Sequence, residues 1–243
     1  MSRFYVPTGS VKGKTISISG DEAHHILDVM RLKPLEKVVV FDGTGKEYTG
    51  FIKDAKRKSL TVEITGTREV PAVVNIAVTL IQAIPKKDKM DRIVEKATEL
   101  GVNSVMPVVT GRTIVDWDEP KRSSAAERWR RIAREAAKQC GRTDIPQIGD
   151  VRPFADIVST FGTYDLAMVA ALSDGTMELK KALAGFRGKT IAIAIGPEGD
   201  FTPDEIRDAL SAGARPVSLG PRVLKSDTAG PAVLAILDYE LSR

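Results

Sequence analysis

The alternation of apolar strand-like runs with helical segments after about residue 75 most constrains the fold of this chain. Strands are predicted at residues 76–81, 104–109, 165–170, 190–195 and 216–219. Such alternation predicts a largely parallel sheet with helices on both faces. Because ligands bind such sheets at the carboxyl ends of the strands, the loops that follow these runs are the expected location of a site.

Two glycine-containing loops follow strands of this predicted sheet. Residues 196–199 (GPEG) precede a helix that is marked by Thr202 as N-cap, Pro203 at its first position and Glu205 as the capping-box carboxylate. Residues 219–229 (LGPRVLKSDTA) lead into the last helix. Glycine lets the backbone approach a ligand closely, so we expect both loops to wall one site. The alternative for residues 196–199 is a strand-to-helix connection whose glycines serve only geometry.

The two loops also carry charges suited to a ligand. Arg222 and Lys225 bring two cations, and Glu198 places a carboxylate at the mouth of the first loop. The second loop further contains two apolar side chains that can cover a ring and two polar ones that can cap the last helix, namely Val223, Leu224, Ser226 and Asp227.

The first 70 or so residues follow another pattern. Strands are predicted at residues 3–6, 15–19, 37–42, 47–53 and 59–65, interrupted by one short helix with Asp21 as its N-cap. Gly43 and Gly45 join two of these strands and indicate a hairpin. We therefore expect a small β-rich barrel or sheet at residues 1–71, ended by Pro71, and a second domain at residues 72–243.

Composition narrows the function classes. The 243 residues carry a formal net charge of +4, which suits a polyanionic partner. The single cysteine, Cys140, cannot form an internal disulfide, and no apolar run reaches the ~20 residues of a membrane helix, so we expect a cytoplasmic protein with no membrane contact. His24 and His25 point about 100° apart on a helix, which is poor metal-chelating geometry. We expect no metal site.

Basic residues concentrate in two places. Residues 121–142 hold eight cations and two glutamates, and in a helix at residues 124–140 Arg131 and Arg134 lie opposite the apolar face of Trp129. We favour phosphate contact over a solvated helix face, because carboxylates usually interleave such a face more evenly. Three lysines within residues 86–89 crowd the start of another helix, where the dipole disfavours cations and an anionic partner would relieve the cost.

Taken together, a series of motifs resembles the bacterial ribosomal RNA small subunit methyltransferase E family. The motifs are RFYVP at residues 3–7, HH at 24–25 with VMR at 29–31, KMD at 89–91, EKATELG at 95–101, EAAKQCGR at 135–142, GPEG at 196–199 and LGPRVL at 219–224. The resemblance covers nearly the whole chain. It implies a PUA-like RNA-binding domain followed by a SPOUT methyltransferase domain, whose trefoil knot binds S-adenosylmethionine. It also implies a homodimer that methylates uridine N3 in 16S rRNA of the 30S subunit.

The resemblance also implies roles for residues. Cofactor binding falls on Gly196, Pro197, Glu198, Gly199, Leu219, Gly220, Val223, Leu224, Ser226, Thr228 and Ala229. We expect Arg222 and Lys225 to stabilise the deprotonated uracil ring, and Glu198 or Asp227 to accept the proton or contact the cofactor. RNA contact is expected from Arg3, His25, Arg31, Lys33, Lys86, Arg112, Arg128, Arg131, Arg134 and Arg142.

Three positions depart from the family pattern. The family often has glycine where Asp200 stands, and often arginine and glutamate where Lys225 and Asp227 stand. Lysine keeps the charge of arginine but not its fork geometry. Two alternatives stay open, namely a SPOUT enzyme acting on another RNA or position, and a non-catalytic RNA-binding protein of ribosome assembly. The intact loops favour an active enzyme.

Overall fold

The computed structural model describes residues 3–70, 76–115, 117–172 and 175–241. The chain forms two compact units, the first made of residues 1–72 and 134–145 and the second of residues 73–133 and 146–243. The predicted domain boundary between residues 71 and 72 lies outside the described residues and stays a prediction. Each unit is built around its own sheet.

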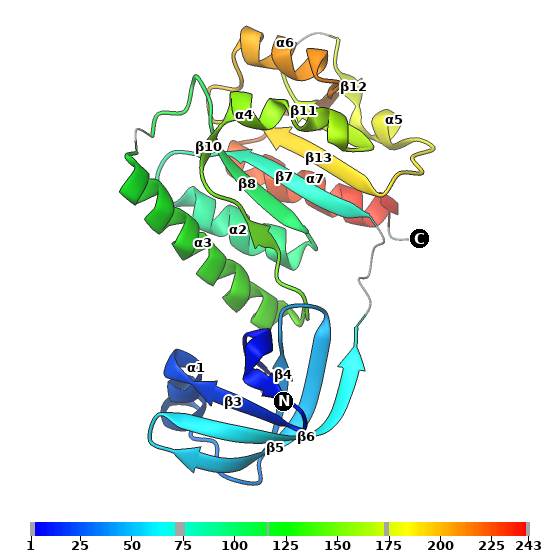
Figure 1. Cartoon of the computed structure of the whole chain (residues 1–243). Coiled ribbons are helices and arrows are strands. Elements are labelled where there is room, and N and C mark those ends of the chain that lie inside the picture. The colour runs from blue at the N-terminus through cyan, green and yellow to red at the C-terminus, as the bar shows by residue number, and fades with distance from the viewer. Residues whose placement is uncertain (1–2, 71–75, 116, 173–174, 242–243) are drawn as a thin grey trace. The chain divides into compact units, whose positions relative to one another are not determined.

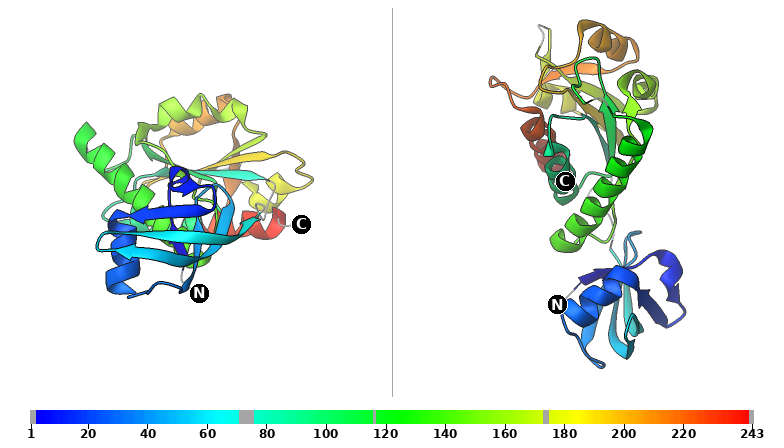
Figure 2. Two further views of the ribbon diagram at one scale, coloured as in Figure 1. Left: turned by 60° about the horizontal axis from the view of Figure 1, so that its bottom comes forward. Right: turned by 90° about the vertical axis from the view of Figure 1, so that its left-hand side faces the viewer.

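The first unit contains a six-stranded sheet in the order β1-β4-β5-β6-β3-β2. Its strands, in blue to cyan, are seen from two further sides in Figure 2. Its strands are β1 (Arg3–Tyr5), β2 (Val11–Lys12), β3 (Thr15–Ser19), β4 (Lys37–Phe41), β5 (Lys46–Lys56) and β6 (Ser59–Glu69), and a short turn of helix, η1 (Thr8–Ser10), precedes β2. β1 pairs with β4 in parallel, and all other pairs are antiparallel. The predicted β-rich first domain is therefore confirmed.

The helix of this unit starts earlier than predicted. α1 (Gly20–His24) continues into a π-helical turn, η2 (His25–Val29). Its N-cap is Ser19 rather than Asp21, because the chain turns directly after β3 at Gly20, whose φ is +67°. Buried side chains of α1 and η2 pack against those of the sheet, in a core of Phe4, Val6, Ile16, Ile18, Ala23, Ile26, Val38, Val40, Tyr48, Ile52, Leu60 and Val62.

The predicted hairpin between β4 and β5 is confirmed, and it also receives a distant segment of chain. The N–H of Gly45 donates to the carbonyl oxygen of Thr143 at 3.1 Å. In the same unit, Nζ of Lys138 lies 3.0 Å from Glu22 Oε2. These contacts explain why residues 134–145 belong to the first unit.

The second unit contains an eight-stranded sheet in the order β10-β8-β7-β13-β11-β14-β12, with β9 also paired to β8, and each pair of neighbours is parallel. Its strands are β7 (Ala77–Ala83), β8 (Ser104–Val109), β9 (Gln147–Ile148), β10 (Arg152–Pro153), β11 (Leu166–Ala170), β12 (Met177–Glu178), β13 (Thr190–Ile195) and β14 (Arg215–Ser218). Its helices are α2 (Lys89–Glu99), α4 (Phe154–Val158), the short η3 (Phe161–Thr163), α5 (Leu179–Leu183), α6 (Pro203–Ser211) and α7 (Ser226–Leu241). The long helix α3 (Glu119–Cys140) begins in this unit, and its residues from 134 onward belong to the first. The predicted parallel sheet is confirmed.

Helices cover both faces of this sheet, with α4 and α6 on one face and α2 and α7 on the other (Figure 1). Alternate side chains of β7 serve the two faces. Ile81 belongs to the core with Phe154 of α4, whereas Gln82 lies beneath α7. Gly230 packs closely there, because a Cβ at this position would lie 2.8 Å from Gln82 Oε1 and that side chain would have to shift. The backbone of α7 thus packs directly on the sheet.

Local sequence chemistry sets the start of α6 as predicted. Thr202 accepts a hydrogen bond from the N–H of Glu205, whose carboxylate accepts one from Thr202, and Pro203 occupies the first helical position. Ser226 already lies inside α7. Within the described residues, none of the helices combines the length and apolar character needed to span a bilayer.

Candidate active site

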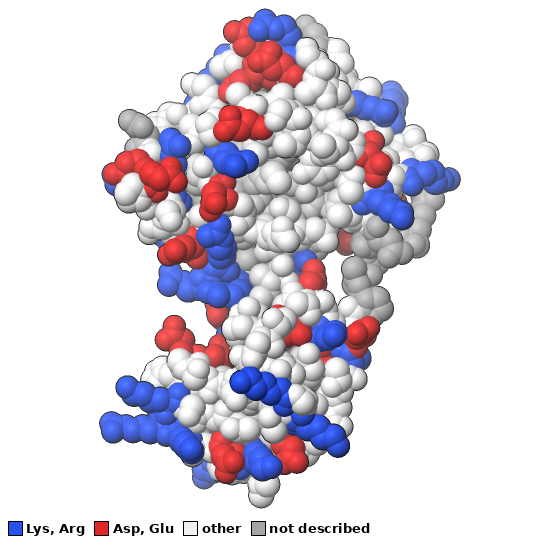
Figure 3. All heavy atoms as spheres, viewed as in Figure 1, with Lys and Arg blue, Asp and Glu red and all other residues white. Residues whose placement is uncertain are grey.

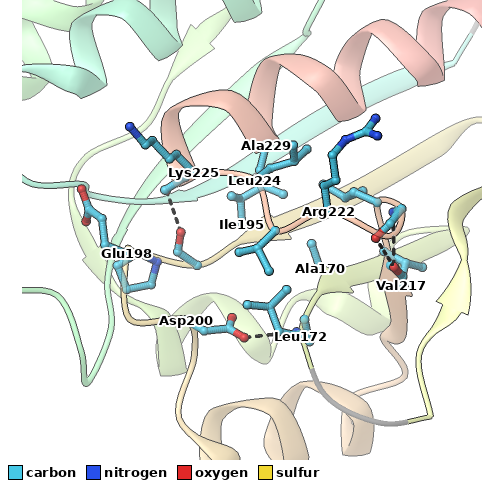
Figure 4. A pocket seen from close by; sticks show the side chains of 18 of the residues that line it. Ala170, Leu172, Ile195, Glu198, Asp200, Val217, Arg222, Leu224, Lys225 and Ala229 are labelled. Carbon is cyan, nitrogen blue, oxygen red and sulfur yellow. Dashed lines mark hydrogen bonds between the residues drawn. The ribbon is translucent and has the colours of Figure 1, made fainter.

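A cavity of about 350 Å³ opens at the carboxyl ends of β11, β13 and β14. Three loops and the start of α2 form its walls (Figure 4). The lining residues are Lys89, Ala170, Ala171, Leu172, Ile195, Gly196, Pro197, Glu198, Asp200, Val217, Ser218, Leu219, Gly220, Arg222, Val223, Leu224, Lys225, Ser226 and Ala229. The two glycine-containing loops therefore share one cavity, as the sequence predicted.

Most residues predicted for the cofactor and the chemistry line this cavity, and three do not. Gly199 faces the side chain of Arg112 instead, at 3.4 Å from where its Cβ would stand. Thr228 is exposed on the first turn of α7, and Asp227 does not line the cavity but pairs with Lys89, which does. Gly199, Asp227 and Thr228 therefore lie near the cavity without lining it.

A buried hydrogen-bonded chain holds the two loops together. The hydroxyl of Ser226 donates to the carbonyl oxygen of Gly196 at 2.7 Å, and the amide of Gln82 donates to that hydroxyl at 3.0 Å. Gln82 is 0% exposed and also donates to the carbonyl oxygen of Ala83 at 3.0 Å. The hydroxyl expected to cap α7 thus joins the ends of β13 and α7 to the central strand β7.

Glu198 is held in place by the start of α2. Its carboxylate accepts hydrogen bonds from the Lys86 N–H at 3.2 Å and from Lys89 Nζ at 3.1 Å. Lys89 Nζ also lies 3.3 Å from Asp227 Oδ1. Burial raises the pKa of Glu198, but hydrogen bonds from its own N–H, Lys89 and Lys86 outweigh this and leave the pKa below its ordinary value. The hydrogen bond that Lys89 donates to Glu198, followed by its bond to Asp227, raises the pKa of Lys89, so Lys89 and Glu198 form an ion pair at neutral pH.

Asp200 occupies a backbone conformation that favours glycine. Its φ is +62°, in the left-handed region that residues with a side chain rarely adopt. The side chain compensates through two bonds, because Oδ1 accepts from the Phe201 N–H at 2.8 Å and Oδ2 from the Leu172 N–H at 3.2 Å. The carboxylate thereby fixes the loop after β11 against the loop after β13.

The floor of the cavity is apolar and its rim is basic. Ala170, Leu172 and Ile195 lie between the two cations, with Arg222 on one side and Lys225 on the other (Figure 4). Both cations are exposed and have no ion-pair partner among the described residues. Such a site can hold a flat apolar group on its floor and stabilise negative charge at its mouth.

Several lining residues were not predicted for the site, and Lys89 is one of them. The sequence indicated it only as one of three lysines at a helix start and as part of the KMD motif at residues 89–91. The loop at residues 170–172 was also missed, although it follows a predicted strand. The rule that ligands gather at strand carboxyl ends pointed to this loop as well.

Among the predicted RNA contacts of the first unit, two side chains are largely committed to the fold. Arg3 is 15% exposed, pairs with Glu47 at 3.0 Å and lies 4.8 Å from the centre of the Phe41 ring. His25 packs edge-on against Phe4, with ring centres 6.1 Å apart. Their packing explains the presence of both residues without any RNA.

Of the other four predicted RNA contacts in that unit, three have exposed side chains and one is half-buried in an ion pair. Arg31 and Lys33 are exposed after η2. Arg134 is exposed, and its guanidinium lies 5.9 Å from the centre of the ring of Tyr5. Arg142 is half-buried and pairs with Asp144 at 2.5 Å.

In the second unit, other contacts involve three of the four predicted RNA-binding residues. Arg112 donates to the carbonyl oxygen of Gly199 at 2.6 Å, and Arg128 pairs with Asp91. The backbone N–H of Lys86 donates a hydrogen bond to Glu198. The side chains of Lys86 and Arg131 are exposed. Acidic side chains accompany the basic ones over the face shown in Figure 3.

The described residues include no group of three or more His, Cys, Asp or Glu placed to hold a metal ion. His24, one of the two adjacent histidines, lies with Nδ1 2.7 Å from Asp28 Oδ2 on the same helical segment.

Comparison with known proteins agrees with this architecture. Residues 73–238 match the family described as RNA methyltransferase domain, and residues 18–65 match the RNA methyltransferase PUA domain. A parallel α/β unit with a ligand cavity at its strand ends, accompanied by a β-rich unit of this kind, thus defines an RNA methyltransferase with a PUA domain.

Full-length relatives narrow the class further. The chain is 31% identical over 235 residues to ribosomal RNA small subunit methyltransferase E of Bacillus subtilis, covering 93% of this chain and 90% of that protein. The chain belongs to the ribosomal RNA small subunit methyltransferase E family, which confirms the resemblance noted in the sequence.

Two solved structures of similar proteins contain a cofactor. One is the Neisseria gonorrhoeae ribosomal RNA small subunit methyltransferase E bound to S-adenosyl methionine, with a TM-score of 0.88, 28% identity and coverage of 99% of this chain and 98% of that one. The other is a putative methyltransferase from Legionella pneumophila in complex with the same cofactor, with a TM-score of 0.87, 30% identity and coverage of 98% and 97%.

Proposed function

We propose that this chain transfers a methyl group from S-adenosylmethionine to N3 of one uridine in 16S rRNA of the small ribosomal subunit. The observation that carries this proposal is the convergence of the loops at residues 196–200 and 218–226 on one cavity, with Arg222 and Lys225 at its mouth. The cavity supplies a place for a cofactor, and the two cations supply a place for negative charge.

The residues present suit the cofactor. A volume of about 350 Å³ lies within the ~300–1,000 Å³ typical of small-molecule sites. Ile195, Val217 and Leu224 offer apolar surface for an adenine ring. Gly220 lines the cavity with a φ of +122°, a backbone conformation that residues with a side chain rarely adopt. When bound, S-adenosylmethionine supplies an electrophilic methyl group on a sulfonium sulfur.

The protein groups at the cavity act on the uracil ring. N3 of uridine becomes a nucleophile only after it loses its proton, and the resulting negative charge spreads to the neighbouring carbonyl oxygens. Arg222 and Lys225 stabilise this charge, because both line the cavity and neither is neutralised by a described carboxylate.

Glu198 and Asp227 take different roles in this proposal. A carboxylate whose pKa lies below its ordinary value is a weak proton acceptor, so Glu198 serves to position the first loop and the start of α2. Asp227 does not line the cavity, but it pairs with Lys89 and helps hold that lysine in place. The proton of N3 passes to solvent or to a group of the RNA.

RNA binding by the predicted basic residues, assembly into a homodimer, a trefoil knot and a cytoplasmic location complete the proposal. Arg31, Lys33 and Arg131 support the RNA contacts best, because they are exposed and have no described ion-pair partner. Phosphate contacts of this kind predict an RNA affinity that falls steeply as salt is added.

The direct test is transfer of labelled methyl from S-adenosylmethionine to 30S subunits that lack the modification, followed by mapping of the labelled nucleotide. Label at a single uridine N3 of 16S rRNA supports the proposal. Arg222→Ala should lower the rate about 100-fold, while the exposed Arg187→Ala should leave it unchanged. Cofactor binding without transfer to any RNA would instead indicate a non-catalytic assembly protein.

A further inference from the structure

A second cavity, of about 300 Å³, lies in the methyltransferase unit apart from the loops described so far. The start of α2 forms one wall, the first half of α3 forms the other, and Trp117 closes it from the segment before α3. None of the proposed catalytic or cofactor-binding residues lines it. Its chemistry therefore needs an explanation of its own.

Both tryptophans of the chain line this cavity. Trp129 is 2% exposed, and its indole N–H donates to Asp91 Oδ1 at 3.1 Å, so it forms a fixed floor. Trp117 is half-buried, and its ring centre lies 6.1 Å from that of Trp129 at an interplanar angle of 35°. The cavity thus offers an accessible aromatic ring held on a rigid base.

The cavity also favours an anion. The carboxylate of Asp91 is already engaged by Trp129 and Arg128. Lys87 and Lys121 are exposed and have no ion-pair partner in the described part of the chain, and Asp88 is the remaining carboxylate at the cavity. An aromatic ring beside uncompensated cations matches a nucleotide, whose base stacks while its phosphate pairs with lysine.

The position relative to the cofactor cavity follows from the chain itself. Lys87 and Asp88 line the second cavity, whereas the next residue, Lys89, lines the first. Consecutive residues at the start of α2 therefore line the two sites. We propose that the second cavity binds a nucleotide of the RNA substrate close to the methylated uridine, with its base on Trp117 and its phosphate between Lys87 and Lys121. This inference rests on the proposed RNA substrate.

Intrinsic fluorescence tests the inference directly, because all tryptophan emission arises at this cavity. Titration of the full-length protein with a short single-stranded oligouridylate should quench that emission in a saturable way. Uridine monophosphate should quench it only at much higher concentration, because it lacks the neighbouring phosphates. Equal affinity for the mononucleotide would overturn the assignment to RNA and indicate a free-nucleotide site.

Variants locate the binding, with the affinity read from the anisotropy of a labelled oligouridylate. Trp117→Ala should weaken binding about tenfold, whereas Trp117→Phe, which keeps a ring, should stay within a few-fold of the parent. Lys121→Glu should also weaken binding about tenfold. Lys180→Glu on α5 makes the same change of charge at an exposed position away from the cavity and should have little effect. Equal losses for the two lysine variants would contradict the site.

The two proposals fail in different ways. If Trp117→Ala and Lys121→Glu methylated 30S subunits as well as the parent at limiting substrate, the nucleotide site would be wrong and the enzymatic proposal would stand. If the parent failed to methylate 30S subunits while oligouridylate still quenched its fluorescence, the proposed reaction would be wrong and the RNA site would stand.

Discussion

Lys89, the first residue of α2, donates a 3.1 Å hydrogen bond to Glu198, which lies 109 residues later in the loop after β13. The N–H of Lys86 supports the same carboxylate. One lysine side chain, which also reaches Asp227, thus connects three segments that meet at the cofactor cavity. Through this contact, the turn between β7 and α2 controls the shape of the site.

Replacing this lysine should therefore impair the enzyme more than it impairs the fold. In Lys89→Met the carboxylates of Glu198 and Asp227 lose their shared cation, and we expect methyl transfer to fall tenfold or more. Steady-state rates and cofactor affinity measure this. Lys96→Met on the same helix removes a lysine whose ion pairs, among the described residues, are with Glu95 and Glu99, and it should be nearly silent. Equal effects of the two variants would contradict a special role for Lys89.

Stability should depend on pH through Glu198. The folded protein holds the pKa of this carboxyl below its ordinary value of 4.5, so the ionised form stabilises the fold. That contribution is present in full above the unfolded pKa and is lost as the pH falls through the folded pKa. Denaturant unfolding of the parent and Glu198→Gln should show a difference that is constant near neutrality and shrinks below about pH 4.5. If the difference in stability grew on acidification instead, the pKa of Glu198 would be raised, not lowered, in the folded protein.

Ser226→Ala should destabilise the second unit. It leaves the amide of Gln82 and the carbonyl oxygen of Gly196 without their shared partner in a buried place, which costs about 1–3 kcal/mol in the free energy of unfolding. Chemical denaturation measures the loss. The exposed Ser159, which bonds only to the nearby Asp156 carbonyl, provides the matched control, and Ser159→Ala should change stability by less than about 0.5 kcal/mol.

Asp200 allows the backbone and side-chain contributions to be separated. Asp200→Gly and Asp200→Ala both remove the carboxylate that accepts from the Leu172 N–H. A φ of +62° strains alanine but not glycine. We expect the alanine variant to be about 1 kcal/mol less stable than the glycine variant. Paired denaturation curves decide this, and equal stabilities would mean that the loop relaxes away from the left-handed conformation.

Structural elements were predicted best from the sequence where they depend on contacts between residues close together in the chain. Thr202, Pro203 and Glu205 specify the start of α6 through contacts within four residues, and they stand where expected. The apolar runs specify strands and, through their alternation with helices, a parallel sheet. Asp21 failed as a cap because the start of α1 depends on the turn at Gly20, which periodicity does not report.

The parts that the sequence missed depend on contacts between distant segments. Lys89 and Glu198 meet only after β7 and β13 become neighbours in the sheet. The excess of cations at residues 121–142 is likewise reduced in the fold, since Asp91 and Asp150 pair with Arg128 and Arg130. A local count of charges has no access to these carboxylates.

The position of β13 between β7 and β11 has a consequence for synthesis on the ribosome. The strand at residues 77–83 emerges first, but its partner on one side is not made until residues 190–195 have been translated. Until then a hydrophobic edge of β7 is open to pairing with other chains. An enzyme that serves the ribosome thus passes through an aggregation-prone stage as a nascent chain, and slower translation before β13 should lower its soluble yield.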